Sequence, residues 1–289
     1  MSKRLVSCVV LLLVLGAATH GQVTSVLYSR APADGDADDT VWIAATDGSS
    51  DQQITNGGWP RLSPDGNYMV FKRGSDPDIN RHDVWVHNLQ TGDEVKVFSN
   101  NDFVVNYSWT SDSTQIVFDY QCGIYIMNSD GSNMRPLIQA DCFDDAPALS
   151  PIDGTIAFHN AHAGLFLANP DGSNRRQILN TVPGDYWPSW SPDGQAIAYA
   201  HSPDGGLNSL TNYFLIVPDG SGAIQLTFLS DPDRLGPAGS WSPDGSVLVA
   251  PGNIGGVQGL YAIATDGSGT MTLLPTSAGS AIDFAGSVQ

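Results

Sequence analysis

The stretch Ser189-Trp-Ser-Pro-Asp-Gly194, with the apolar run 196–200 behind it, decides the fold of this chain. The same pattern returns at 240–245, and altered copies stand at 61–66, 108–113 and 148–154. The apolar residues that precede the turn are, in order, Leu62, Trp109, Leu149, Trp190 and Trp241. They are 47, 40, 41 and 51 residues apart. A period of this length, made of short strands, is typical of β-propeller blades.

Each copy divides into four short strands, called a to d. In the fourth copy we expect strands at 187–190, 196–200, 213–217 and 223–227, because apolar and β-branched or aromatic residues alternate there. In Ser-Pro-Asp-Gly, proline presets φ at the second position of the turn, and the aspartate side chain can form a hydrogen bond with the nearby backbone. Glycine adopts the left-handed conformation that a tight a–b hairpin needs. The aspartates of these turns are therefore predicted to build the blades.

A second series of turns, between strands c and d, counts the blades. It begins at Thr46, Gln90, Ser129, Pro170, Pro218 and Thr265, and its six copies predict six blades. Only five complete a–b motifs exist. We expect the remaining blade to combine N-terminal strands at 25–29, 41–45 and 52–55 with a C-terminal strand at 281–287, in which Phe284 takes the tryptophan position. This arrangement closes the ring and removes open sheet edges.

The composition agrees with an all-β protein. Of the 30 acidic residues only Glu94 is a glutamate, and the chain has 31 glycines and 18 prolines, which favour turns over helices. The formal net charge is −18, and it becomes −20 (10 − 30) if Lys3 and Arg4 are removed with a leader. Such a surface repels phosphate backbones, so we expect no nucleic-acid partner.

The N-terminus has the pattern of a secretory signal. Lys3 and Arg4 precede an apolar run of 11 residues at 5–15, and small residues follow at 16–18. The run is too short to span a bilayer, which takes about 20 residues. We predict a signal peptide at 1–21 and one mature propeller domain at 22–289, periplasmic or secreted. We expect it to be a monomer without a transmembrane segment.

The repeat resembles that of the TolB-type propellers, in its Trp-Ser-Pro-Asp-Gly turn, its apolar second strand and its Pro-Asp-Gly-Ser turn. The resemblance covers the chain from about Val23 onward. It implies a six-bladed propeller that acts as a protein-binding platform in the bacterial periplasm. The α/β domain that precedes the propeller in the cell-envelope TolB protein has no counterpart in this sequence. Membership in the Tol–Pal system is therefore not implied.

The loops between strands b and c and between strands d and a are long and varied, whereas the turns on the other face are short and uniform. Loops on a rigid scaffold often carry function. We therefore expect an exported, non-enzymatic scaffold that binds a protein or peptide of the cell envelope, or a glycan, on this acidic face. The predicted binding residues are Asp83, Asp119, Asp144, Asp145, Asp185, Tyr186 and Trp187.

Cys122 and Cys142 fall in loops on that same face, 20 residues apart. In an oxidising compartment we expect them to form a disulfide, which by the loop-entropy model contributes about 3 kcal/mol. In the cytosol they would remain two free thiols.

A metal-dependent polysaccharide lyase or hydrolase, with its site in the channel, is the alternative function. It would need His159, His201 or His82 to converge with Asp119 or Asp145 around a divalent ion. No local spacing such as His-Glu-x-x-His supports this. The acidic run 34–39 resembles the start of a calcium loop but lacks its glycine and its final glutamate. We expect no cofactor, with a divalent cation such as calcium as the alternative.

Overall fold

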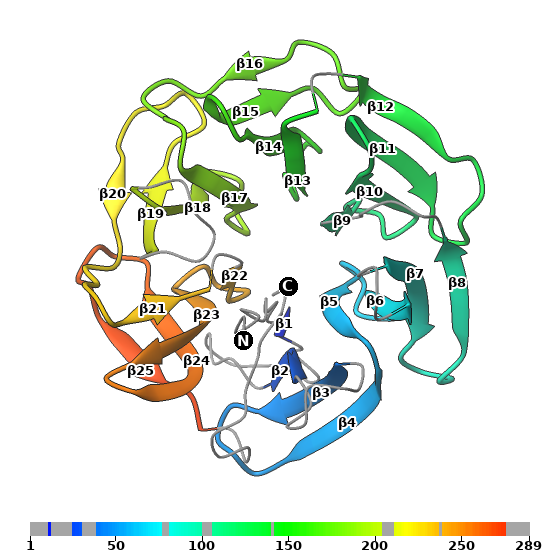
Figure 1. Cartoon of the computed structure of the whole chain (residues 1–289), viewed down its shortest axis with the longest axis horizontal. Coiled ribbons are helices and arrows are strands. Elements are labelled where there is room, and N and C mark those ends of the chain that lie inside the picture. The colour runs from blue at the N-terminus through cyan, green and yellow to red at the C-terminus, as the bar shows by residue number, and fades with distance from the viewer. Residues whose placement is uncertain are drawn as a thin grey trace.

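The computed structural model describes residues 11–12, 25–30, 39–76, 81–99, 106–139, 142–203, 211–236 and 239–275. Within these ranges the chain forms strands and turns and no helix. Six antiparallel sheets stand around a central channel (Figure 1). The six-bladed, all-β propeller predicted from the repeat is therefore confirmed. No helix in the described ranges is long and apolar enough to cross a membrane.

Each blade is one sheet, and the blades are numbered here in chain order. Blade 1 contains β1 (Leu11–Leu12), β2 (Ser25–Arg30), β3 (Thr40–Ala45) and β4 (Asp51–Asn56). Blade 2 contains β5 (Gly58–Leu62), β6 (Tyr68–Asp76), β7 (Arg81–Asn88) and β8 (Glu94–Phe98). Blade 3 contains β9 (Tyr107–Trp109), β10 (Gln115–Asp119), β11 (Gly123–Asn128) and β12 (Arg135–Gln139).

The second half of the ring repeats this plan. Blade 4 contains β13 (Asp144–Leu149), β14 (Ile156–Asn160), β15 (Gly164–Ala168) and β16 (Arg176–Gln177). Blade 5 contains β17 (Asp185–Trp190), β18 (Ile197–His201), β19 (Asn212–Ile216) and β20 (Ile224–Gln225). Blade 6 contains β21 (Arg234–Leu235), β22 (Ser240–Trp241), β23 (Val247–Ile254), β24 (Val257–Ala264) and β25 (Met271–Leu273).

The a–b turns have the chemistry that their sequence predicts. In blade 5 the Ser191 hydroxyl donates to a carboxylate oxygen of Asp193 at 2.6 Å, and the backbone N–H of Gln195 donates to the same oxygen at 3.0 Å. Gly194 closes the turn with a φ of 69°. The equivalent position of blade 3 is Ser113, which adopts the same left-handed conformation, with a φ of 60°. The regular aspartates of the repeat are therefore structural.

The first blade differs from the expected arrangement. Its inner position is filled by β1, where Leu11 and Leu12 pair with Leu27 and Val26 of β2. These leucines belong to the segment predicted as a signal peptide. The predicted C-terminal strand, 281–287, lies outside the described residues, as does most of the predicted signal. Closure by a C-terminal strand therefore stays a prediction.

The core lies between neighbouring blades. The second strand of each blade is buried on both faces, and Phe71, Phe118 and Phe158 at equivalent positions have at most 1% of their surface exposed. Each buried side chain of this size contributes about 1.5–3 kcal/mol. Tryptophans of the inner strands also donate hydrogen bonds between blades. Trp109 Nε1 bonds the carbonyl of Arg61 at 3.0 Å, and Trp241 Nε1 bonds that of Ser189 at 3.1 Å.

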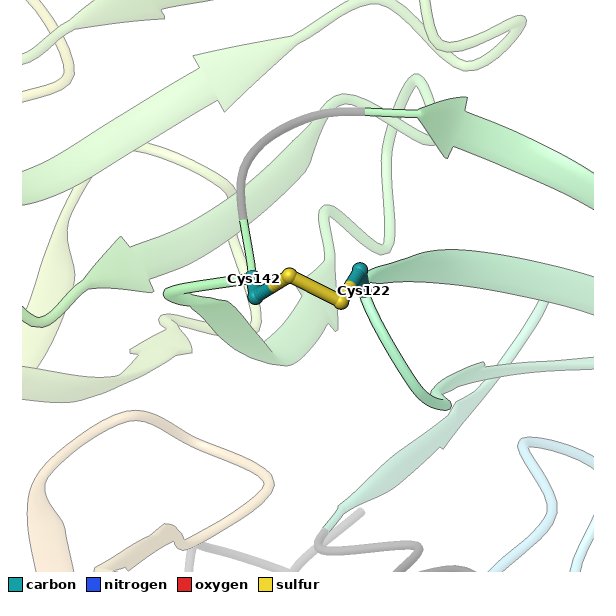
Figure 2. Close-up of a disulfide and its surroundings, with 2 residues drawn as sticks. All are labelled: Cys122 and Cys142. Atoms are coloured by element: carbon teal, nitrogen blue, oxygen red, sulfur yellow. A yellow bond between two sulfur atoms is a disulfide. The ribbon is translucent and has the colours of Figure 1, made fainter.

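The predicted disulfide joins Cys122, ahead of β11, to Cys142, ahead of β13 (Figure 2). It therefore links blade 3 to the segment that enters blade 4, across a sequence separation of 20 residues.

Candidate binding cavity in the channel

A cavity of about 350 Å³ occupies the channel at the end where the inner strands reach the a–b turns. Because the blades repeat, its described lining residues fall into rings of equivalent positions. The rim is the second position of the a–b turn and is mostly proline: Pro64, Ser111, Pro151, Pro192 and Pro243. The turns that build the blades thus also form the mouth of the cavity.

The wall contains two further rings. The apolar anchors of the repeat, Leu62, Trp109, Leu149, Trp190 and Trp241, all border the cavity. The residue immediately before each anchor borders it too: Arg61, Ser108, Ala148, Ser189 and Ser240. Four of these five positions hold a small residue, and one holds an arginine. The wall is therefore aromatic and hydroxyl-rich, with a single long cationic side chain.

The floor is built by bulges in the inner strands. The pairing with the second strand shifts register after Gly58, Asp145 and Tyr186. The residues that follow, Trp59, Ala146 and Trp187, have φ values of 58°, 51° and 54°, and each precedes a proline. A left-handed conformation costs a non-glycine residue roughly 1–2 kcal/mol, so the surrounding fold must impose it. Ala146 and Trp187 line the cavity.

Two tryptophans meet at the floor. Trp59 belongs to β5 and Trp187 to β17, in blades on opposite sides of the ring (Figure 1). Their ring centroids are 5.4 Å apart and the planes are tilted by 54°. An aromatic contact of this kind contributes about 0.5–1.5 kcal/mol beyond the area that it buries. The pair reaches across the channel below the cavity.

Arg61 is the one charged residue among the described residues that line the cavity. Burial in the channel lowers the pKa of its guanidinium to about 10, with Tyr107 and Tyr213 as opposing influences. At neutral pH the group is therefore still a cation. The side chain as a whole is half-buried, because part of it faces the cavity.

A cluster of charged groups lies behind the floor. Asp119 accepts the backbone amides of Asn106 at 3.1 Å and Ala146 at 3.0 Å. Burial, and next the Asp145 carboxylate, raise the pKa of Asp119 to about 6. Burial lowers the pKa of Lys72 to about 7, and its ammonium lies 4.6 Å from the ring centroid of Trp59. Asp119, one of the predicted binding residues, therefore holds the backbone of two residues that line the cavity.

Three other predicted acids are buried in pairs within their own blades. Asp144 accepts Asn160 Nδ2 at 2.7 Å and Arg175 Nη2 at 2.8 Å. Asp83 accepts Lys96 Nζ at 3.2 Å and the Ser99 hydroxyl at 2.6 Å.

Asp185 lies within 2.6 Å of His201 Nδ1 and accepts the Val182 amide at 2.8 Å. Burial raises the pKa of Asp185. These acids stand at the ends of the inner strands away from the cavity, or on outer strands. They stabilise the blades, and a role in binding remains a prediction.

The remaining predicted residues are Asp145, Tyr186 and Trp187, and they have different surroundings. Asp145 forms an ion pair with His159, its cross-strand partner. The Tyr186 hydroxyl lies 2.9 Å from that of Thr211. Trp187 is the one predicted binding residue that lines the cavity.

The histidines do not converge. His159 and His201 each pair with an aspartate of their own blade, and the side chain of His82 lies outside the described residues. In the part of the chain that the structure describes, no three His, Cys, Asp or Glu side chains come together as a metal site would require. Residues 34–38 of the acidic run lie outside the described ranges as well. Binding of a divalent cation such as calcium therefore stays a prediction.

Of the residues that line the cavity, only Trp187 was predicted as a binding residue from the sequence. Their signal was the register of the repeat: aligned on the apolar anchor, the preceding residue is Arg61 in one copy and Ser108, Ala148, Ser189 or Ser240 in the others. This alignment of the repeat copies shows one cationic residue at a position where the other copies have a small residue.

The fold and the repeat define the class of this protein. A family model described as the TolB beta propeller domain matches residues 21–288, so the chain belongs to the TolB β-propeller family.

Solved structures share this architecture. TolB from Acinetobacter baumannii is 18% identical with a TM-score of 0.74, and the match covers 89% of this chain and 65% of that one, less than two thirds of its length. A putative TolB from Agrobacterium tumefaciens is 17% identical with a TM-score of 0.59, over 78% of this chain and 83% of that one.

An oligogalacturonate lyase in complex with manganese has a similar fold. It is 20% identical with a TM-score of 0.57, over 86% of this chain and 73% of that one. At these identities the similarities establish the fold alone, because the same propeller carries different functions. The described residues of this chain contain no group of three His, Cys, Asp or Glu side chains that could hold a metal ion.

Proposed function

We propose that this chain is an exported, non-enzymatic propeller that holds a segment of a partner protein in the channel cavity. The observation that carries the proposal is the lining of that cavity. Among its described residues it has tryptophans, prolines and serines but no Asp, Glu, His, Lys or Cys. General acid–base catalysis most often uses His, Asp, Glu or Lys, and a serine nucleophile needs an adjacent base; since the described lining supplies none of these groups, it favours binding over chemistry.

A peptide fits this lining better than a compact ligand does. Tryptophan and proline surfaces bind extended segments through flat apolar contacts, and serine hydroxyls can satisfy the polar backbone of the bound chain. The floor and walls are held by bonds between blades, such as that from Trp109 to the carbonyl of Arg61. A cavity built from such a rigid scaffold loses little conformational entropy on binding.

This proposal moves the site from the acidic b–c and d–a loops to the opposite end of the channel. The buried pairing of Asp83, Asp144 and Asp185 supports the move, since pulling these acids away from their partners would leave buried groups unsatisfied.

The lyase or hydrolase alternative would need an acid and a base, or metal ligands, that reach a substrate inside the cavity. It predicts formation of an unsaturated or hydrolysed sugar from an acidic polysaccharide, which ultraviolet absorbance and reducing-end assays measure.

The test is selection of a displayed random peptide library on the purified propeller, followed by calorimetric titration of the enriched peptides. The cavity is blocked by Ser108→Trp, and Ser49→Trp on an exposed turn is the matched control. The proposal expects peptides that bind the native chain and the control but not the blocked variant. Peptides that bind all three alike, or no enriched peptide at all, contradict it.

A further inference from the structure

We infer that the segment bound in the cavity leaves it between blades 5 and 6, and that a Lys or Arg side chain of this segment binds in the groove lined by Asp193 and Asp244. The inference rests on the proposed function and specifies the chemistry of the partner. It starts from a second hollow, a groove of about 410 Å³ that both aspartates line. The two blades that form this groove are neighbours in the ring (Figure 1).

The groove is continuous with the cavity. Pro192, Trp241 and Pro243 line both spaces, so these three residues form the boundary between them. The indole of Trp241 is held in place, because its Nε1 donates to the carbonyl of Ser189 at 3.1 Å. An extended chain covers about 3.3 Å per residue, so a segment that occupies the cavity reaches the groove within a few residues.

The lengths of the a–b turns explain the space between blades 5 and 6. The turn of blade 4 has one residue more than that of blade 5, and this turn places Ile152 against Gly194 of blade 5. In the shorter turn of blade 5, Pro192 is the residue that lies beside Gly245 of blade 6. The groove lies at this junction of the two short turns.

The two aspartates of the groove use one carboxylate oxygen each for their own turns. Oδ1 accepts a serine hydroxyl and a backbone N–H, at 2.6 and 3.0 Å for Asp193 and at 2.6 and 3.1 Å for Asp244. Within the described ranges, Oδ2 of these residues makes no hydrogen bond. The hydrogen bond from Ser191 lowers the pKa of Asp193. Partial burial acts against the hydrogen bonds at Asp244, but its pKa is lowered as well. Both groups are therefore anions at neutral pH.

A basic side chain fits this groove. Two carboxylates line it, whereas none of its described lining residues is Lys, Arg or His. Leu215 and Trp241 add apolar surface, against which the long stem of a Lys or Arg can pack while its charged end stays near the carboxylates. A metal ion fits less well, because the described residues contain no group of three His, Cys, Asp or Glu side chains that could hold one.

The cavity and the groove together define the expected segment. The described lining of the cavity is rich in tryptophan and proline and contains no acid, so it suits apolar or proline residues. The groove suits a cation. The partner segment should therefore combine a short apolar or proline stretch with one Lys or Arg beside it.

The experiment is a parallel selection of a random dodecapeptide display library on the native chain and two double variants. In Asp193→Asn/Asp244→Asn, asparagine keeps an acceptor oxygen for each turn and removes the charge. The control is Asp130→Asn/Asp171→Asn, on exposed c–d turns where Oδ1 also accepts a serine hydroxyl and a backbone N–H. Both variants change the net charge equally. We expect Lys or Arg to be enriched at one position on the native chain and the control, and this preference to be lost on the groove variant.

Individual peptides then make the test quantitative. A peptide selected on the native chain should bind the groove variant about fivefold more weakly, because ion pairs at exposed sites are individually weak. Its Lys→Met or Arg→Met analogue should show a similar loss on the native chain and little further loss on the groove variant. Added salt should weaken binding to the native chain more than binding to the groove variant. Thermal melting separates this result from a folding defect, since a purely structural role of the aspartates would lower the melting temperature without changing peptide preference.

Three outcomes are decisive. Basic enrichment that persists on the groove variant places the cation elsewhere and overturns the inference. Peptides that bind the native chain but not Ser108→Trp, and that show no basic preference, overturn the inference and leave the proposed function intact. Peptides that bind Ser108→Trp as well as they bind the native chain contradict the proposed function, and with it the inference.

Discussion

Trp59 of blade 2 and Trp187 of blade 5 meet across the channel, with ring centroids 5.4 Å apart. Both residues are in the left-handed conformation, and both are followed by a proline. The inner strands of two opposite blades are therefore bulged at the same level, and each bulge directs a large ring toward the axis. Trp187 lines the cavity, and the ring of Trp59 lies 4.6 Å from the ammonium of Lys72.

Truncation of the floor should destabilise the whole ring. Replacing Trp187, which has 7% of its surface exposed, by Ala should lower the free energy of unfolding by about 3–5 kcal/mol, because it leaves a cavity between opposite blades. Chemical denaturation measures the change. A cycle with Trp59→Ala should give a coupling energy of about 0.5–1.5 kcal/mol. Strictly additive losses would mean that the two rings do not stabilise each other.

The tryptophans of the inner strands should differ in what their indole nitrogens contribute. Trp109→Phe removes the hydrogen bond to the carbonyl of Arg61, and should cost about 1 kcal/mol more than Trp190→Phe. Trp190 is the matched control, because its buried Nε1 has no hydrogen-bond partner within the described ranges. Urea denaturation of both variants checks this difference. Equal losses would show that the bond between blades 2 and 3 contributes no net stability.

Stability should fall as the pH rises from about 4 to about 6. The pKa of Asp119 is about 6 in the folded protein, against an ordinary value of 3.8. In this range the folded chain keeps a proton that the unfolded chain has lost, so the free energy of unfolding decreases by about 3 kcal/mol in all. Denaturation at several pH values measures it, and Asp119→Asn should remove this decrease, although the variant is less stable overall. A slope that survives in Asp119→Asn belongs to other groups.

Lys72 should produce the opposite slope at higher pH. Its pKa is lowered to about 7 by burial, against an ordinary value of 10.5. Between these values the unfolded chain holds the proton that the folded chain has lost, so the free energy of unfolding increases with pH. Lys72→Met should flatten this increase. If Lys72→Met and the native chain rise in parallel, the ammonium is not desolvated as the structure indicates.

The disulfide should stabilise the propeller by closing a loop in the unfolded chain. Its partners are 20 residues apart, so the double variant Cys122→Ala/Cys142→Ala should lose about 3 kcal/mol. A reducing agent should lower the stability of the native chain by a similar amount and leave that of the double variant unchanged. Sensitivity of the double variant to the reducing agent would point to another thiol-dependent process.

The blades could be predicted from sequence because their turns are local. Ser191, Asp193 and Gly194 bond within one hairpin, and such contacts depend only on residues a few positions apart. The disulfide followed from the same count of strands, since it placed both cysteines on one face. The strand at the inner position of blade 1 was harder to predict, because no recognisable turn motif connects β1 to β2 in the sequence.

The candidate site could be predicted only in part, because it forms between blades. Trp187 was identified among the aromatic residues, but its partner Trp59 is 128 residues earlier and approaches from the opposite side of the ring. Acids such as Asp144 were assigned to a binding surface because they fall on the face of the long, varied loops. Their burial depends on Arg175 and Asn160, which the strand pairing brings to them. Patterns of one strand do not contain that information.

The most direct test of the central claim is a crystal structure of the propeller with a peptide selected on the native chain. We expect the peptide in the channel between the proline rim and Trp187, in contact with the tryptophans of the wall. A peptide seated instead on the b–c and d–a loops, over Asp144 and Asp185, would contradict this account and restore the acidic face as the binding site.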